Sequence, residues 1–168
     1  LTNEFYEKTK DLEISVRIIE DDAVSISRIL GSKFFDMVVF QHSINDIIQS
    51  ILCSKAGIDT IGSDWMEILP QMICLIQDDL KNGVLEQKVK KEFLHLLFSC
   101  INVLTDNGVL IFNHHMFQYD LDLGYPYDIW FNMIPMARKW IAESDLGLQE
   151  IFFQGFQKQW WMYLKKVS

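Results

Sequence analysis

Apolar and polar residues alternate in several short stretches of the chain, and this pattern predicts strands. Ile14, Val16 and Ile18 fall on one face of a strand expected over residues 13–19. Two mainly apolar segments, residues 34–40 with Asp36 as their one polar member and residues 109–112, are typical of strands buried within a sheet. Residues 148–153 and 159–164 flank a segment that contains Gly155, which indicates an antiparallel hairpin at the C-terminus.

A longer repeat of about 3.6 residues covers the region between the two buried strands and predicts three helices. We expect them over residues 44–56, 64–81 and 84–104, followed by Gly57, Gly83 and Gly108 as helix terminators. A fourth helix is expected over residues 134–144, and a short helical turn over residues 25–30. This alternation predicts a Rossmann-like α/β fold with a mostly parallel sheet, helices on both faces and a C-terminal antiparallel hairpin.

Polar side chains gather where the two buried strands end. The first strand is followed by Gln41, His42, Ser43, Asn45 and Asp46, and the second by Asn113, His114 and His115. Ligands of open α/β sheets bind beyond the carboxyl ends of the strands, so parallel neighbouring strands would bring these groups to one site. The structural alternative is that Ser43 caps the following helix and that His42 is a half-buried histidine. His114 and His115 are adjacent on a strand end and point to opposite faces, so at most one of them is expected to enter the crevice.

Composition narrows the classes of partner. The 168 residues are 49% hydrophobic and carry a net charge of −8, which argues against binding to a phosphate backbone. The longest apolar stretch, residues 65–76, is interrupted by Glu67 and Pro70 and is too short to span a bilayer. We therefore expect one domain over residues 1–168 without a nucleic-acid or membrane partner. The three cysteines are widely spaced and are expected to be reduced thiols of a cytoplasmic protein; the pattern does not indicate an oligomeric state.

Four segments occur in an order similar to that of the second half of a class I S-adenosylmethionine-dependent methyltransferase. They are ISVRIIEDDAVSI, FFDMVVFQHSIND, LTDNGVLIFNHH and LGLQEIFFQGFQKQWWMYLKK, which cover most of residues 14–166 apart from a longer helical stretch between residues 58 and 85. The resemblance implies S-adenosylmethionine as the cofactor. Asp21 or Asp22, with the Ala23 amide, would then bind the adenine amino group. Phe40, Gln41 and His42 would line the methionine part of the cofactor and the methyl-transfer path.

The chain departs from this family in its cofactor site. Its eight glycines are isolated, so the glycine-rich turn that would cradle the carboxypropyl end of the cofactor is missing, as is the acidic residue for the ribose. The sheet order of the family would also leave residues 13–19 without their partner strand. We therefore expect this chain to be the C-terminal portion of a larger methyltransferase-like domain, completed by residues upstream of Leu1. On this interpretation the 168 residues do not catalyse alone.

The expected reaction is methyl transfer to a small-molecule acceptor. Such a displacement relies on proximity and desolvation and needs a base only where the nucleophile is protonated. His42, His114 and His115 could each serve as the base, because an imidazole ordinarily titrates near neutrality, and His42 and His115 are the predicted catalytic residues. Candidates for acceptor binding are polar residues after the first buried strand, together with aromatic residues in and after the expected loop at residues 118–127: Asn45, Asp46, Tyr119, Tyr125, Tyr127 and Trp130.

Two alternative functions remain open from the sequence. One is a non-catalytic interaction module with a methyltransferase-like fold, which the missing glycine turn favours. The other is a metal-dependent hydrolase with His42, Asp46 and one of the adjacent histidines as ligands. No HxH or HExxH spacing supports that ligand set, so no metal site is expected.

Overall fold

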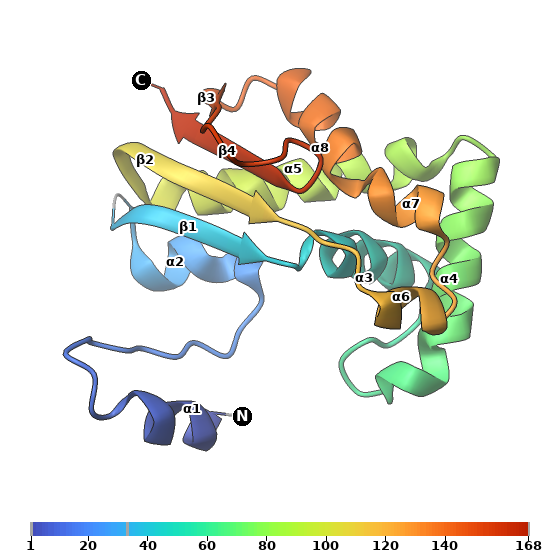
Figure 1. Ribbon diagram of the computed structural model, residues 1–168, viewed down its shortest axis with the longest axis horizontal. Coiled ribbons are helices and arrows are strands. Elements are labelled where there is room, and N and C mark those ends of the chain that lie inside the picture. The colour runs from blue at the N-terminus through green and yellow to red at the C-terminus, as the bar shows by residue number, and fades with distance from the viewer. Residues whose placement is uncertain (1, 33, 168) are drawn as a thin grey trace.

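The computed structural model describes residues 2–32 and 34–167 and contains a four-stranded mixed sheet (Figure 1). The strands are β1 (Phe35–Gln41), β2 (Leu104–Asn113), β3 (Leu148–Ile151) and β4 (Trp161–Lys166). Their order across the sheet is β1-β2-β4-β3. β1 and β2 are parallel, whereas β4 is antiparallel to both β2 and β3.

The predicted mostly parallel sheet is therefore wrong, because β1 and β2 form the only parallel pair among the described residues. The reason lies in the C-terminal hairpin, which supplies half of the strands. Residues 152–160 are too short a connection for a parallel crossover, so β3 and β4 run in opposite directions. Because β4 and not β3 takes the place beside β2, the pairing with β2 is antiparallel as well.

The predicted pairing of residues 37–40 with residues 109–112 is confirmed. Val38 lies opposite Leu110 and Phe40 opposite Phe112, in parallel register. The rings of Phe40 and Phe112 stack with their centroids 4.7 Å apart. The crossover between the two strands consists of three helices, α3 (Ile44–Ala56), α4 (Trp65–Lys81) and α5 (Leu85–Val103).

Local signals set two of the helix ends. Gly57 ends α3 in the left-handed conformation with φ 74°, as the sequence predicts. Asp64 begins α4 by accepting a hydrogen bond from the Met66 N–H at 2.8 Å. β2 begins at Leu104, directly after α5, and so starts several residues earlier than the predicted strand at residues 109–112.

Helices cover one face of the sheet and not both, which is the second correction to the predicted fold. α5 packs on β2, and α8 (Met133–Ala142) packs on β4. The core between them contains Phe93, Phe112 and Trp140, all fully buried, with ring centroids 5.6 Å apart for Phe93 and Trp140. Phe112 alternates with side chains that point to the other face, so one face of each strand belongs to this core.

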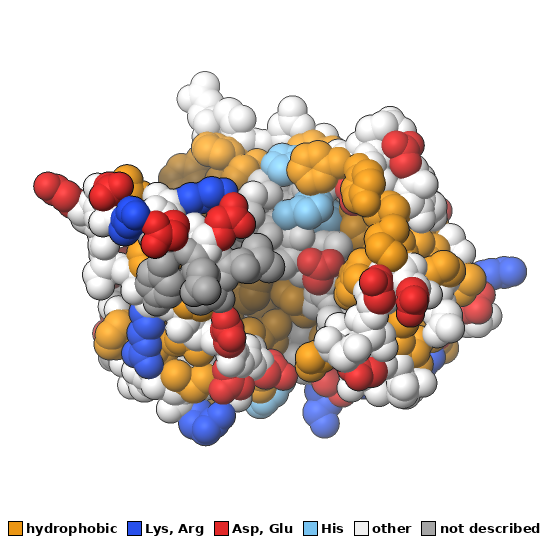
Figure 2. Space-filling view, turned by 90° about the horizontal axis from the view of Figure 1, so that it is seen from below, with side chains coloured by type: hydrophobic (Ala, Val, Ile, Leu, Met, Phe, Trp, Pro, Cys, Tyr) orange, Lys and Arg blue, Asp and Glu red, His pale blue; other side chains and the backbone are white. Residues whose placement is uncertain are grey.

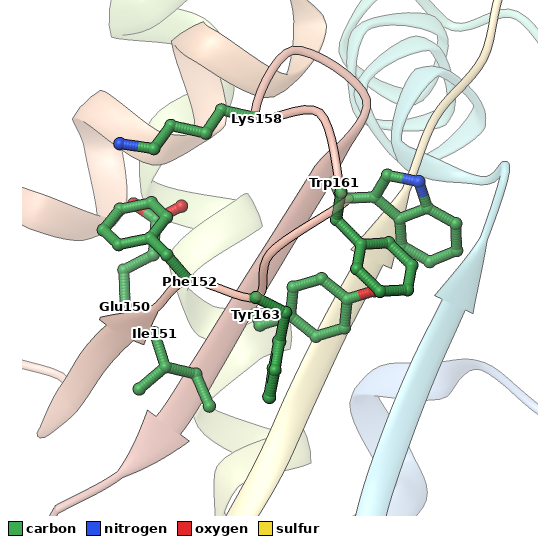
Figure 3. Close-up of a pocket in the computed structure, with 8 residues that line it drawn as sticks. Glu150, Ile151, Phe152, Lys158, Trp161 and Tyr163 are labelled. Carbon is green, nitrogen blue, oxygen red and sulfur yellow. The ribbon is translucent and has the colours of Figure 1, made fainter.

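Apolar side chains line the opposite face of the sheet. Met37 and Val39 of β1 are 54% and 49% exposed there. Figure 3 shows Trp161 and Tyr163 projecting from β4 beside Phe152, around a hollow of about 60 Å³. We call this surface the open face and define it by Met37, Val39, Phe153, Phe156, Trp161 and Tyr163.

The predicted strand at residues 13–19 is wrong. The helix α1 (Thr2–Thr9) lies apart from the sheet in Figure 1. The chain after it is irregular up to η1 (Ala23–Ser25) and α2 (Ile26–Leu30). Ile14 is 58% exposed, and within the described residues this segment pairs with no strand. An alternating pattern makes a strand only where a partner satisfies its backbone groups.

None of the described helices has the length and apolar content needed to cross a membrane.

Candidate functional site

The polar ends of β1 and β2 meet, because the two strands are parallel neighbours. The His42 N–H donates to the Asn113 carbonyl oxygen at 2.8 Å, which extends the pairing one residue beyond β1. The His42 and His114 rings stack with their centroids 5.2 Å apart and an interplanar angle of 12°. The His115 N–H also points to His42 Nδ1, at 3.4 Å. The two polar clusters recognised in the sequence are therefore in contact at the ends of the two strands.

The backbone of His42 is in the left-handed region, with φ 51°. A residue with a side chain rarely adopts this conformation, and such strain is common at functional sites. Here it turns the chain from β1 into α3 and brings the imidazole between His114 and Phe117, whose ring centroid lies 4.9 Å away. No feature of the sequence indicates this conformation.

His114 is buried, with 1% of its surface exposed. Neither of its ring nitrogens has a hydrogen-bond partner among the described residues. Burial, together with a smaller effect of the neighbouring charge of His42, lowers the pKa of His114 to about 3. The Trp130 backbone opposes this shift weakly but does not reach hydrogen-bond geometry with the ring. His114 is therefore neutral near pH 7 and packs as an aromatic ring.

A cleft of about 500 Å³ opens beside His42. Its walls come from α3, from the start of α4 and from two short helices, α6 (Gln118–Asp122) and α7 (Tyr127–Phe131), in and just after the expected loop. The polar and aromatic lining residues include His42, Asn45, Asp46, Trp65, Tyr119, Asp120, Tyr125 and Trp130. We call this the acidic cleft, because Asp46 and Asp120 are the charged carboxylates in its lining.

Two buried polar atoms on the wall of the acidic cleft lack partners. Asn45 is 5% exposed, and its Nδ2 donates to Asp46 Oδ1 at 2.7 Å, which leaves Oδ1 as the unpaired end. Trp130 is 1% exposed, and its Nε1–H has no acceptor among the described residues. A buried polar atom without a partner costs about 1–3 kcal/mol, so a ligand group that reached either atom would recover part of this cost.

Asp46 lies at the centre of the site. Although its side chain is open to solvent in the cleft, the surrounding protein excludes enough water to raise the pKa of its carboxyl. His42 opposes this shift and Asp120 adds to it. Asp120 is held in place from the other wall, where its Oδ2 accepts the Phe117 N–H at 2.8 Å.

Tyr125 forms part of the floor of the same cleft. Its hydroxyl donates to Gln49 Oε1 at 3.0 Å, and its ring centroid is 3.9 Å from that of Trp130. Burial raises the pKa of Tyr125 to about 12, so its hydroxyl stays protonated and fixed as a donor to Gln49. The floor is thus a rigid aromatic surface.

A second cleft of about 530 Å³ lies on the other side of Asp46. We call it the η1 cleft, since Asp22, Ala23 and Val24 form one wall and Ser43, Asp46, Ile47 and Ile51 of the α3 region form the other. Ser43 begins α3 without making a side-chain cap within the described part of the chain, so the predicted capping role is not used. Figure 2 shows this side of the molecule, where histidine and acidic side chains border a hollowed area.

The predicted cofactor residues are divided by the fold. Asp22 and Ala23 line the η1 cleft, and Asp22 Oδ1 also accepts the Val24 N–H at 2.9 Å. Asp21 Oδ1 accepts the Asp22 N–H at 2.7 Å and lies outside both clefts. Phe40 packs on the core, and Gln41 is exposed at the end of β1, so neither lines a cleft.

The predicted catalytic and acceptor residues are divided as well. His42, Asn45, Asp46, Tyr119, Tyr125 and Trp130 all line the acidic cleft. His115 lies outside both clefts, where its Nε2 is 2.8 Å from Asn113 Nδ2 and its ring packs near Trp160 and Trp161. Tyr127 also lies outside and stacks on Phe131, with ring centroids 5.5 Å apart.

Sequence reasoning missed Asp120 and Trp65. Asp120 lies three residues after Phe117, and its carboxylate accepts the Phe117 N–H at the start of α6. This spacing is a signal for a short helix within the expected loop. Trp65 directly follows the α4 cap residue Asp64, and only the tertiary packing brings it to the acidic cleft.

No protein-family model, curated protein or solved structure matches this chain. The described residues also contain no group of three or more His, Cys, Asp or Glu side chains placed to hold a metal ion. The case for a function therefore comes from the geometry of the two clefts.

Proposed function

We propose that the protein transfers a methyl group from S-adenosylmethionine to a small-molecule acceptor. The observation that carries this proposal is the position of Asp46, which lines both the η1 cleft and the acidic cleft. A donor in one cleft and an acceptor in the other would meet at this residue. The resemblance noted in the sequence is consistent with the same division, because it implies adenine near Asp22 and Ala23 and the reacting end beside His42.

The residues of the η1 cleft suit the adenine end of the cofactor. Asp22 uses Oδ1 for the Val24 N–H, so its other oxygen is available to an adenine amino group. Val24, Ile47 and Ile51 supply apolar surface for the flat ring. No glycine-rich turn lines either cleft in the described residues, so contacts to the carboxypropyl end would have to come from elsewhere.

Methyl transfer needs little acid–base catalysis from the protein. S-adenosylmethionine would supply a methyl group bonded to a sulfonium. The lone pair of the acceptor would form the new bond to the methyl carbon while the sulfur–carbon bond breaks and its electron pair stays on sulfur. On this proposal the main contribution of the two clefts is to hold the two reactants in line with each other. A protonated acceptor must first lose its proton to the protein or to solvent.

Asp46 is better placed than His42 to take that proton. The His115 N–H points to His42 Nδ1 at 3.4 Å, so this ring nitrogen is already occupied as a hydrogen-bond acceptor. Asp46 faces both clefts, and burial raises the pKa of its carboxyl above its ordinary value. We therefore assign proton removal to Asp46 and orientation of the reactants to His42.

The cysteines support placing the protein in the cytoplasm. Cys53 and Cys100 are buried free thiols and Cys74 is an exposed free thiol. Unpaired thiols are typical of reducing compartments.

The open face supports a second candidate, a non-catalytic interaction module. Met37, Val39 and the aromatic side chains of β4 leave an apolar sheet surface uncovered, and such surfaces are typical of contact sites. On this alternative neither cleft would bind the cofactor.

A thermal unfolding experiment on the complete natural protein separates the two candidates. Under the methyl-transfer proposal, S-adenosylhomocysteine raises the unfolding midpoint, since a ligand at 100 times its Kd adds about 2.7 kcal/mol of stability. Guanosine triphosphate, which lacks the sulfur-linked chain, serves as the control and leaves the midpoint unchanged. No shift with either S-adenosylmethionine or S-adenosylhomocysteine at millimolar concentration would favour the interaction module.

A further inference from the structure

The acidic cleft is lined by carboxylates and not by lysine or arginine side chains of the described residues. Asp46 and Asp120 line it from α3 and α6, and its described lining contains no lysine or arginine. The two carboxylates are close enough for Asp120 to raise the pKa of Asp46. Carboxylates of this kind repel an anionic ligand and attract a cation.

An unpaired acceptor points to the same kind of ligand. Asn45 Oδ1 is buried and has no hydrogen-bond partner within residues 2–32 and 34–167, while Nδ2 of the same side chain donates to Asp46. An acceptor is satisfied by a donor, and an ammonium group offers three N–H donors at one point. The two carboxylates and Asn45 Oδ1 thus form a set of acceptors that a protonated amine would satisfy.

The remaining walls are aromatic. Trp65, Tyr119, Tyr125 and Trp130 line the cleft, and ring faces attract a cation through their quadrupole. Trp130 Nε1–H is a buried donor that has no acceptor in the described part of the chain, and an oxygen on the body of the ligand would satisfy it.

We propose that the acidic cleft binds a small organic amine in its protonated form, with a flat or apolar body that carries a hydrogen-bond acceptor. This inference rests on the proposed methyl transfer in one respect, namely that the amine would be the methyl acceptor. Binding holds the ammonium between Asp46, Asp120 and Asn45. Transfer then requires the amine to give one proton to Asp46, so that its nitrogen lone pair forms the bond to the methyl carbon.

The test uses three matched probes that differ in charge at one position. Tyramine is cationic at pH 7, tyrosol carries a neutral hydroxyl in place of the amine, and 4-hydroxyphenylacetate is anionic. Calorimetric titration of each into the complete natural protein, without cofactor, should show tyramine binding at least about tenfold more tightly than tyrosol, and no binding of the anion.

Variants locate the binding. Asp46→Asn and Asp120→Asn should each weaken tyramine binding by about five- to tenfold and leave tyrosol binding unchanged. Asp120→Asn keeps an oxygen for the Phe117 N–H, so the fold of α6 is retained. Asp122→Asn is the matched control, because Asp122 lies on the same helix but outside the cleft, bonded to Gln118.

Equal binding of tyramine and tyrosol, tighter binding of the anion, or no binding of any probe at millimolar concentration would overturn the inference. The cofactor is titrated separately. If the protein does not bind the cofactor but still binds tyramine more tightly than tyrosol, the methyl-transfer proposal is overturned and the cation site is not. If the protein binds the cofactor but does not prefer tyramine to tyrosol, the cation site is overturned and the methyl-transfer proposal is not.

Discussion

His42 and His114 stack face to face at the ends of the two parallel strands, with their ring centroids 5.2 Å apart. The contact is possible because Gln41 and Asn113 are register partners and each histidine follows one strand end. It places a titratable ring in contact with a buried ring whose nitrogens have no partner among the described residues. Protonation of His114 is therefore opposed both by burial and by its neighbour.

The first prediction concerns stability at acidic pH. His114 has a pKa of about 3 in the folded state, below the ordinary value of 6.5, so the unfolded chain binds a proton first as the pH falls. The stability from this group is fully present above pH 6.5 and is lost as the pH falls from 6.5 towards 3. Between pH 6.5 and 4.5, His114 alone should lower the free energy of unfolding by about 2 kcal/mol.

Urea unfolding at several pH values measures this share. His114→Phe, which keeps an aromatic ring in the stack, should show a smaller loss of unfolding free energy over that interval than the natural protein does. His95→Gln is the control, since His95 is exposed on α5. An acid sensitivity that His114→Phe leaves unchanged would contradict the assignment.

The second prediction concerns the core beneath the site. Phe112 is fully buried between Phe40 and Phe93, at centroid distances of 4.7 and 6.3 Å. Phe112→Ala should lower the free energy of unfolding by about 4 kcal/mol, because it removes a ring and leaves a cavity under the strand ends. Phe98→Ala, at a position 51% exposed on α5, should change it by less than about 0.5 kcal/mol. Similar losses for the two variants in urea unfolding would argue against the described core.

The third prediction concerns the attachment of the C-terminal hairpin to α8. Arg138 Nε lies 2.9 Å from both carboxylate oxygens of Glu150, and an Nη group donates to the Lys158 and Trp161 carbonyl oxygens. Arg138→Met should cost about 2 kcal/mol, because Glu150 and both carbonyl groups lose their donor. Lys139→Met, next in the chain but 57% exposed, should cost less than about 1 kcal/mol. Chemical denaturation compares the two, and an equal cost would show that the Arg138 network contributes little.

The fourth prediction separates Asp46 from the histidines in catalysis. With an amine that the acidic cleft binds as the acceptor, Asp46→Asn should lower the rate of methyl transfer by about 100-fold, since it removes the proton acceptor. Affinity for S-adenosylhomocysteine should change little, because Asp46 is one residue among many in the η1 cleft wall. His115→Gln should keep nearly full activity, as His115 lies outside both clefts. Release of S-adenosylhomocysteine is the readout, and a larger loss in His115→Gln than in Asp46→Asn would reverse the assignment.

The elements that the sequence predicted well are those with strong local signals. The end of α3 follows from Gly57, and the start of α4 from the Asp64 cap. The parallel neighbours β1 and β2 follow from two mainly apolar segments separated by helices, and their polar ends met as expected. Alternation alone gave a strand at residues 13–19 that the fold lacks, because strand formation depends on a partner that no local pattern reveals.

The site was only partly predictable for a similar reason. The sequence indicated His42, Asn45 and Asp46, which follow one strand end within a few residues. It did not indicate Asp120 or Trp65, which reach the acidic cleft through the packing of α6 and α4. His115 was a candidate because it is an imidazole just after a strand end, yet its ring lies towards Trp160. Which neighbour of a strand end enters a cleft depends on tertiary packing that spacing does not encode.

Calorimetric titration of S-adenosylhomocysteine into the complete natural protein tests the central claim most directly, provided that it includes a variant that fills the η1 cleft. Ser50 lines that cleft on α3, so Ser50→Trp should abolish binding, whereas Ala56→Trp, at an exposed position of the same helix outside the cleft, should not. The account predicts saturable binding by the natural protein and by Ala56→Trp, and at least a tenfold loss, about 1.4 kcal/mol, in Ser50→Trp. No binding by the natural protein, or binding that Ser50→Trp leaves intact, would contradict it.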